Sequence, residues 1–301
     1  MSLHGLGEGW NQMKQMGFLG PLGTHSEAAA LYLNSIIPEA YNLVPCKNIY
    51  EAIHRVEQGE LDTCLVPVEN SIEGSINITL DTLAGSDRLQ VARELIWHVH
   101  NNLMAQKAAV EGVPIQKILS HSQPLSQCRD FLRCNYPLAE LEAVSSTAMA
   151  ASMVAESDPM DGWAAICSLR GGELNGLSVV AGNIEDLPNN CTRFFQLIRK
   201  DNAEMLRGQC CSSWKALIIC QIDGKDAGRL CEILLELARR QVNLTRIESR
   251  PARTGLGEYI FFLDVEIPKD RRRLEEALAG IRKKSIWLRR PGEFPVINAE
   301  N

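Results

Sequence analysis

The chain contains 301 residues, of which 45% are hydrophobic and 23% are charged, and its formal net charge is −6. That length allows about two domains with hydrophobic cores of ordinary size, and the composition is typical of a globular protein. The acidic balance argues against nucleic acid or an anionic membrane as the main partner.

The residue types also limit the chemistry that the chain can carry. None of the 10 cysteines forms a Cys-x-x-Cys pair and none of the 6 histidines belongs to a His-Glu-x-x-His motif, so we expect no metal ion and no cofactor. No stretch is apolar over enough residues to cross a bilayer, and the first residues lack the apolar centre of a signal peptide. We therefore expect a cytoplasmic protein with reduced thiols.

Short apolar strands alternate with helices through the first part of the chain. Residues 17–20, 43–45 and 63–66 have strand patterns, and a helix is expected over residues 49–58. Thr24 opens a capping box, so another helix should begin there. This alternation predicts an open, mostly parallel α/β sheet.

A second α/β unit follows the first. We expect its strands at residues 95–104, 115–119, 141–144, 163–167 and 177–181. Four strands of the two units end in turns rich in hydroxyl or amide side chains, and the turns include Thr24, Asn70, Ser120 and Thr147. Each turn alone is ordinary helix capping, but four turns converging on one cleft would make a site for a small anion.

The segment 189–195 brings a hydroxyl and a guanidinium together. Its two asparagines favour a turn, and the run after them favours a strand, so Thr192 and Arg193 should stand where a strand leaves a loop. Arg offers a planar fork that matches a carboxylate, and Thr donates a hydrogen bond. The alternative is a surface arginine before an edge strand.

The last part of the chain has the element order of a ferredoxin-like domain. A polar, irregular linker over residues 200–213 comes first. The pattern then predicts a βαββαβ order, with strands at residues 214–222, 243–250, 258–267 and 285–288 and helices at residues 229–240 and 270–281.

Six motifs follow one another in a specific order. They are residues 20–26, 67–74, 120–123, 146–151 and 190–194, and then Glu248-Ser249-Arg250-Pro251. Together they resemble the prephenate dehydratase family with a C-terminal ACT regulatory domain, over residues 17–291. The resemblance implies two α/β lobes like a type II periplasmic binding protein, with the active site between them.

The implied domain limits follow from the same resemblance. The catalytic domain would span residues 17–199, the linker residues 200–213 and the ACT domain residues 214–291. Lobe 1 would take residues 17–99 and 182–199, and lobe 2 residues 100–181, so that the two crossings form a hinge.

The resemblance also implies the reaction. Prephenate would lose water and carbon dioxide to give phenylpyruvate in phenylalanine biosynthesis, a lyase reaction without a metal or redox cofactor. Thr192 would assist the leaving hydroxyl and Arg193 would pair with a carboxylate. The remaining substrate-binding residues would be Thr24, Ser26, Asn70, Ser71, Gly74, Ser120, Gln123, Thr147 and Phe194.

The ACT domain would bind L-phenylalanine as a feedback effector in a homodimer, or in a tetramer built from such dimers. The effector-binding residues would be Gly228, Leu230, Asn243, Leu244, Glu248, Ser249, Arg250 and Pro251. Arg229 departs from the family, which usually has an alanine there, so this cation could crowd the effector pocket. His25 also departs, because the family usually has an aromatic residue at that position.

Three alternatives stay open at this stage. His121 is a rival proton donor, because an imidazolium is a stronger acid than a hydroxyl, although a histidine that bonds its own turn is the simpler interpretation. The substrate could be arogenate, which carries an amine in place of the ketone. The chain could also be a non-catalytic sensor of a small carboxylate. Glu69 would repel a dianion unless it is protonated or turned away.

Overall fold

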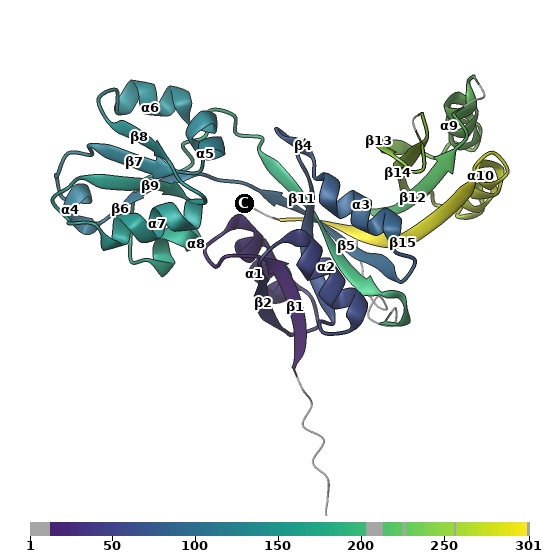
Figure 1. Cartoon of the computed structure of the whole chain (residues 1–301), viewed down its shortest axis with the longest axis horizontal. Coiled ribbons are helices and arrows are strands. Elements are labelled where there is room, and N and C mark those ends of the chain that lie inside the picture. Colours follow the sequence, from purple (N-terminus) through teal and green to yellow (C-terminus); the bar gives the residue numbers. More distant parts are fainter. Residues whose placement is uncertain (1–12, 203–212, 225–226, 256, 300–301) are drawn as a thin grey trace, which may run out of the picture.

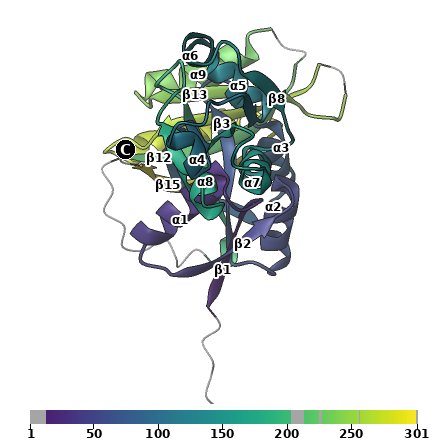
Figure 2. The same ribbon diagram turned by 90° about the vertical axis from the view of Figure 1, so that its left-hand side faces the viewer.

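The structure, a computed structural model, describes residues 13–202, 213–224, 227–255 and 257–299. Three units lie in a row along its long axis: lobe 2 at one end, lobe 1 in the middle and a C-terminal domain at the other end (Figure 1). The view along that axis has lobe 2 in front (Figure 2). Most of the expected linker, residues 203–212, lies outside the described residues.

Lobe 1 is an α/β unit formed by two separate parts of the chain. β1 pairs in parallel with β2 and β3, whereas β11 runs antiparallel to both β3 and β5. Polar caps begin the helices: Thr24 Oγ1 accepts from the Glu27 N–H, and Asn48 Oδ1 accepts from the Glu51 N–H. The elements are β1 (Lys14–Leu19), α1 (His25–Ile36), β2 (Tyr41–Cys46), α2 (Ile49–Gln58), β3 (Thr63–Asn70), β4 (Gly74–Ser75), α3 (Asn77–Gly85), β5 (Leu89–His98) and β11 (Cys191–Arg199).

Lobe 2 has a sheet of its own, in the order β10-β6-β9-β7-β8. Its strands are β6 (Asn102–Ala105), β7 (Lys117–Ser120), β8 (Glu140–Ala143), β9 (Trp163–Cys167) and β10 (Ser178–Ala181). Its helices are α4 (Lys107–Val110), α5 (Ser122–Gln127), α6 (Arg129–Asn135), α7 (Thr147–Glu156) and α8 (Leu169–Leu174).

Two crossings connect the lobes. One joins β5 to β6 and the other joins β10 to β11. The crossings are bonded to each other, because the Val99 N–H donates to the Asn190 carbonyl at 2.8 Å and the Ile184 N–H donates to the Asn101 carbonyl at 2.9 Å. The single strand expected over residues 95–104 is therefore wrong: the chain changes sheets in the middle of that apolar run.

The C-terminal domain has the expected βαββαβ order, with the strands arranged β13-β14-β12-β15. Helices α9 and α10 cover one face through Ile233, Leu237, Leu274 and Leu278. Within the described ranges no helix is both long and apolar enough to span a bilayer. The elements are β12 (Trp214–Ile222), α9 (Arg229–Arg239), β13 (Leu244–Pro251), β14 (Tyr259–Glu266), α10 (Arg272–Arg282) and β15 (Trp287–Asn298).

The C-terminal domain and lobe 1 share one sheet and one core. The last residues of β15 pair in parallel with β5, from Val296 opposite Glu94 to Asn298 opposite Ile96. The other face of the C-terminal sheet places Leu217 and Phe262 in a hydrophobic cluster with residues of α2, α3 and β11. The expected last strand, residues 285–288, is thus too short. β15 continues to Asn298 because its last residues pair with β5, a strand distant in the sequence.

Candidate active site

A cavity of about 490 Å³ lies between lobes 1 and 2. Its walls come from the N-termini of α1, α5 and α7, from the end of β3 and from the start of β11. Seven of the predicted catalytic and substrate-binding residues line it, namely Thr24, Ser26, Asn70, Gln123, Thr147, Thr192 and Phe194. The polar turns therefore do converge on one cleft, because the strands that precede them end at its edge.

Thr192 holds a hydrogen-bonded position in the wall of this cavity. It lies opposite Asn70 in the β11–β3 ladder, and Asn70 Nδ2 donates to Thr192 Oγ1 at 3.0 Å. The Asn70 Oδ1 atom is fixed in turn by the N–H groups of Ile72 and Glu73, at 2.9 and 3.0 Å. Thr192 Oγ1 thus accepts a bond from the protein, and its own proton remains available for a ligand in the cavity.

Buried amides extend this arrangement across the hinge. Asn190 Oδ1 accepts from Asn70 Nδ2 at 2.8 Å, and Asn190 Nδ2 donates to Gln127 Oε1 at 3.1 Å. Asn101 donates to the same Gln127 oxygen at 3.4 Å. The buried Asn101 Oδ1 and Gln127 Nε2 atoms have no protein partner within the described residues, and both residues line the cavity. They offer an acceptor and a donor to a ligand.

None of the described residues lining the cavity is an arginine or a lysine. The positive potential comes instead from the N-termini of α1 and α7, which are 12 and 10 residues long and belong to opposite lobes. Burial and the nearby His100 lower the pKa of His25 to about 4, so this ring is uncharged at neutral pH. An anion in the cavity would therefore be held by backbone N–H groups and neutral side chains, although the Glu73 carboxylate also lines the cavity.

Comparisons with known proteins match most of the chain. The family model "Prephenate dehydratase" matches residues 16–202, and the "ACT domain" model matches residues 218–282. The prephenate dehydratase of Methanocaldococcus jannaschii is 35% identical over 92% of this chain and 97% of that protein. A bifunctional chorismate mutase/prephenate dehydratase of Neisseria gonorrhoeae is 36% identical over 92% of this chain and 73% of its own length. The chain belongs to the prephenate dehydratase family.

A solved structure of this family has the same fold. The prephenate dehydratase of Arthrobacter aurescens, solved in complex with L-Phe, superposes with a TM-score of 0.78 at 34% identity, covering 93% of this chain and 90% of that one. The predicted fold class, two α/β lobes followed by a ferredoxin-like ACT domain, is confirmed, and so is the predicted family.

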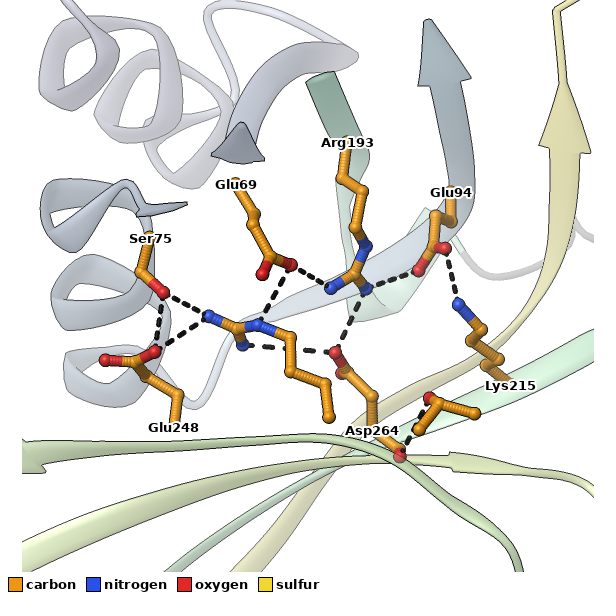
Figure 3. A network of polar contacts seen from close by, with 9 residues as sticks. Glu69, Ser75, Glu94, Arg193, Lys215, Glu248 and Asp264 are labelled. Atoms are coloured by element: carbon orange, nitrogen blue, oxygen red, sulfur yellow. Dashed lines mark hydrogen bonds and ion pairs between the residues drawn. The ribbon is translucent and has the colours of Figure 1, made fainter. Parts of the chain in front are cut away.

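Arg193 does not line the cavity, which corrects our expectation that it reaches a substrate carboxylate. Neighbouring residues of a strand point to opposite faces, so Arg193 leaves β11 on the side away from Thr192. Its guanidinium contacts Glu69 at 2.8 Å, Glu94 at 2.6 Å and Asp264 of the ACT domain at 3.0 Å (Figure 3). Burial lowers the pKa of Arg193, but Asp264 and Glu94 outweigh this and hold it above its ordinary value.

Three more expected residues are placed differently from what the sequence predicts. Ser120 is fully buried and donates to the Ile166 carbonyl at 2.7 Å, because it is still inside β7. Ser71 bonds the returning crossing, through the Asn189 carbonyl and the Cys191 N–H. Gly74 pairs with β3 in β4, outside the cavity lining. Glu69 is turned away from the cavity and contacts Arg193 and Arg246, which is one of the two ways in which it would avoid repelling a dianion.

His121 lines the cavity next to the start of α5. Its Nδ1 accepts from the Gln123 N–H at 3.4 Å, so it bonds its own turn as expected. Glu73, Asn101, Gln127 and Asn190 also line the cavity and were not singled out from the sequence. Asn190 belongs to the motif that carries Thr192, but only the pairing of distant segments brings Asn101 and Gln127 to it.

The expected effector residues do not gather on one face of the ACT domain. Glu248 and Arg250 face lobe 1: Glu248 Oε2 accepts from Ser75 Oγ at 2.5 Å, and Arg250 forms two bonds to Asp81 at 3.0 and 3.1 Å. Ser249 and Pro251 alternate with them and are exposed. The others are Gly228, which caps α9, Leu230 and Leu244, which pack on the ACT core, and Asn243, which donates to Glu266.

Proposed function

We propose that this chain converts prephenate into phenylpyruvate, with loss of water and carbon dioxide, in the cytoplasmic synthesis of phenylalanine. The observation that carries the proposal is the Thr192 hydroxyl, which is fixed by Asn70 in the wall of a cavity between two lobes. Its free proton can be donated to a leaving oxygen, which is what a carbon–oxygen lyase requires. The family assignment supports the same reaction.

Binding would use the two helix N-termini. Prephenate carries two carboxylates, and the N-termini of α1 and α7 offer positive dipole ends from opposite lobes. One carboxylate at each end would hold the lobes closed around the ring. Ser26 and Thr147, which line the cavity at those ends, would add hydroxyl donors, whereas the Thr24 hydroxyl already donates to the Pro21 carbonyl.

Thr192 would act on the leaving group. As the bond between the ring and its carboxylate breaks and carbon dioxide departs, the electron pair enters the ring and the group on the opposite carbon leaves as hydroxide, which takes a proton from solvent and is released as water. The Thr192 O–H would donate to that oxygen, and the Asn70 amide would keep the threonine oxygen in place. Aromatisation drives the reaction, and no electrons are gained or lost overall, so no redox partner is needed.

Arogenate is the second candidate substrate, and one observation favours it. Glu73 lines the cavity, and its carboxylate could pair with the ammonium group that distinguishes arogenate from prephenate. If the chain prefers prephenate, we expect that Glu73 makes no contact with the side chain of the substrate. The variant Glu73→Gln would then leave the ratio of kcat/KM for the two substrates unchanged, whereas an arogenate enzyme would lose its preference.

We further propose feedback control by L-phenylalanine in a dimer formed through the ACT domains. The ACT match and the relative solved with L-Phe support this control. Glu248 and Arg250 bond lobe 1, so an effector at this motif would act directly on the contact between the two domains. Calorimetric titration of L-phenylalanine, with the mass of the particle measured by light scattering, tests both parts. A folded dimer that binds no L-phenylalanine would reject the control.

The direct test of the function is phenylpyruvate formation by the purified chain. Prephenate and arogenate are supplied in parallel, and the product is followed by its absorbance in alkali. Turnover of prephenate supports the proposal. A folded protein that binds prephenate in calorimetry but converts neither substrate would instead be a carboxylate sensor.

A further inference from the structure

Four charged side chains form a closed ring between lobe 1 and the ACT domain (Figure 3). Arg193 contacts Glu69 at 2.8 Å and Asp264 at 3.0 Å. Arg246 contacts the same two carboxylates, at 3.0 Å and 3.9 Å. Lobe 1 supplies Arg193 and Glu69, and the ACT domain supplies Arg246 and Asp264. We call these four residues the ion ring, in which each arginine joins its own domain to the other.

The ion ring is largely withdrawn from solvent. The exposed fraction of the side chain is 1% for Asp264, 10% for Arg246 and 14% for Arg193, and it is 29% for Glu69 at the edge of the ring. A second pair extends the ring, because Glu94 bonds both Arg193 and Lys215 of the ACT domain and is 0% exposed. The formal charges of these six groups cancel, and Glu248, which contacts Arg246 at 3.2 Å and is 27% exposed, adds a negative charge at the edge of the network. Removing one of them leaves an uncompensated buried charge, which the neighbouring strands must move to accommodate.

The ion ring lies directly behind the active site. In the β11–β3 ladder Arg193 stands opposite Glu69, and Thr192 stands opposite Asn70. The two pairs are adjacent along the same strands and point to opposite faces, one into the cavity and one into the ring. A single peptide unit therefore separates the ring from the Thr192–Asn70 hydrogen bond, and the ladder has a bulge between Arg193 and Phe194 at this point.

We propose that Asp264 and Arg246, two residues of the regulatory domain, are positioning residues for the dehydratase reaction. They hold Arg193 and Glu69, and through the backbone of β11 and β3 they fix Thr192 against Asn70. The inference rests on the proposed function for its kinetic part. The ACT domain would then contribute to activity even when no effector is bound. A shift of that domain would reach the Thr192 hydroxyl through the ion ring.

Kinetics test this role with variants on the ACT side of the ring. Asp264→Asn and Arg246→Gln should each lower kcat by about 10- to 100-fold, the size expected when a reacting group is misplaced by about 1 Å, with KM within about twofold. Arg246→Lys keeps the charge and should retain most of the activity. The control is Arg290→Gln, which breaks an exposed ion pair with Glu275 elsewhere in the same domain. Unchanged kcat in both folded ring variants would overturn the inference.

A double variant separates positioning from general weakening. Asp264→Asn and Arg193→Gln break the same ring, so the double variant should lose no more kcat than the worse single variant. Multiplied losses would show that the two residues act independently and would contradict the inference.

Backbone hydrogen exchange tests the same role without turnover. Asp264→Asn and Arg246→Gln should speed exchange about tenfold or more in peptides that cover β11 and the end of β3, and Arg290→Gln should not. Unchanged exchange there would reject the ring as a positioning device, whatever the activity. A wild-type chain that forms no phenylpyruvate but shows the exchange effect would instead reject the proposed function alone.

Discussion

Replacing Arg193 with glutamine separates a structural role from substrate binding. The guanidinium contacts Glu94 and Asp264, whose side chains are 0% and 1% exposed, so Arg193→Gln leaves buried carboxylates without their main partner. Breaking a buried pair in this way costs about 3–5 kcal/mol. For a protein of 301 residues, with an unfolding entropy of about 2.1 cal/mol/K per residue, the melting temperature should fall by roughly 5–8 °C.

The kinetic result should differ from that of a lost substrate ligand. Because Arg193 points away from the cavity, KM for prephenate should stay within about twofold while kcat falls with the displaced strand. Loss of a charged hydrogen bond to the substrate would cost about 1.5–3 kcal/mol and raise KM roughly 10- to 150-fold. Scanning calorimetry and steady-state kinetics of the same preparation decide whether Arg193 has a structural role or binds the substrate. A large rise in KM with an unchanged melting temperature would refute our placement of Arg193.

Two further predictions concern the edges of the cavity. Because the pKa of His25 is about 4 in the fold and 6.5 ordinarily, the unfolded chain binds the extra proton between those values, and stability should fall by about 3 kcal/mol as the pH drops through that range. His25→Phe should flatten the melting temperature between pH 6.5 and 4, and an unchanged pH dependence would contradict the assignment. A Cβ on Gly171 would lie 2.6 Å from the Gly23 carbonyl oxygen across the cleft, so Gly171→Ala should keep the lobes apart. We expect KM for prephenate to rise about tenfold or more at an unchanged melting temperature; unaltered KM would show that closure does not need this contact.

The helix caps show how far local signals reach. Thr24 and Thr147 were found from capping patterns, and both line the cavity because helices that follow strands begin at one edge of the sheet. The βαββαβ order of the ACT domain was equally visible, since each element carries its own periodicity. These features depend on residues close together in the sequence.

Side-chain direction was the main source of error. The motif predicts that Thr192 and Arg193 form one anion-binding pair, but a strand places neighbouring side chains on opposite faces, so only Thr192 faces the cavity. The same rule separates Asn70 from Glu69. Asp264 lies within the apolar run of β14, before the exposed Glu266 that ends the strand, and an acid at such a buried position indicates a buried partner.

Contacts between distant segments could not be read from the sequence. β15 joins β5 through residues just over two hundred positions apart in the chain, such as Val296 and Glu94. Gln127 and Asn101 meet only because the two crossings of the hinge bond each other. Such pairings are fixed by the packing of the whole molecule, which local patterns do not encode.

The measurement that tests the account most directly is kcat for phenylpyruvate formation by Thr192→Val beside Thr192→Ser. Valine has nearly the shape of threonine but no hydroxyl, and serine keeps the hydroxyl. We predict that valine lowers kcat by about 10²–10³-fold, the usual effect of removing one donor to a developing negative charge, while serine retains most of the activity. A valine variant that is folded and turns over prephenate at the wild-type rate would contradict the central role of the Thr192 hydroxyl.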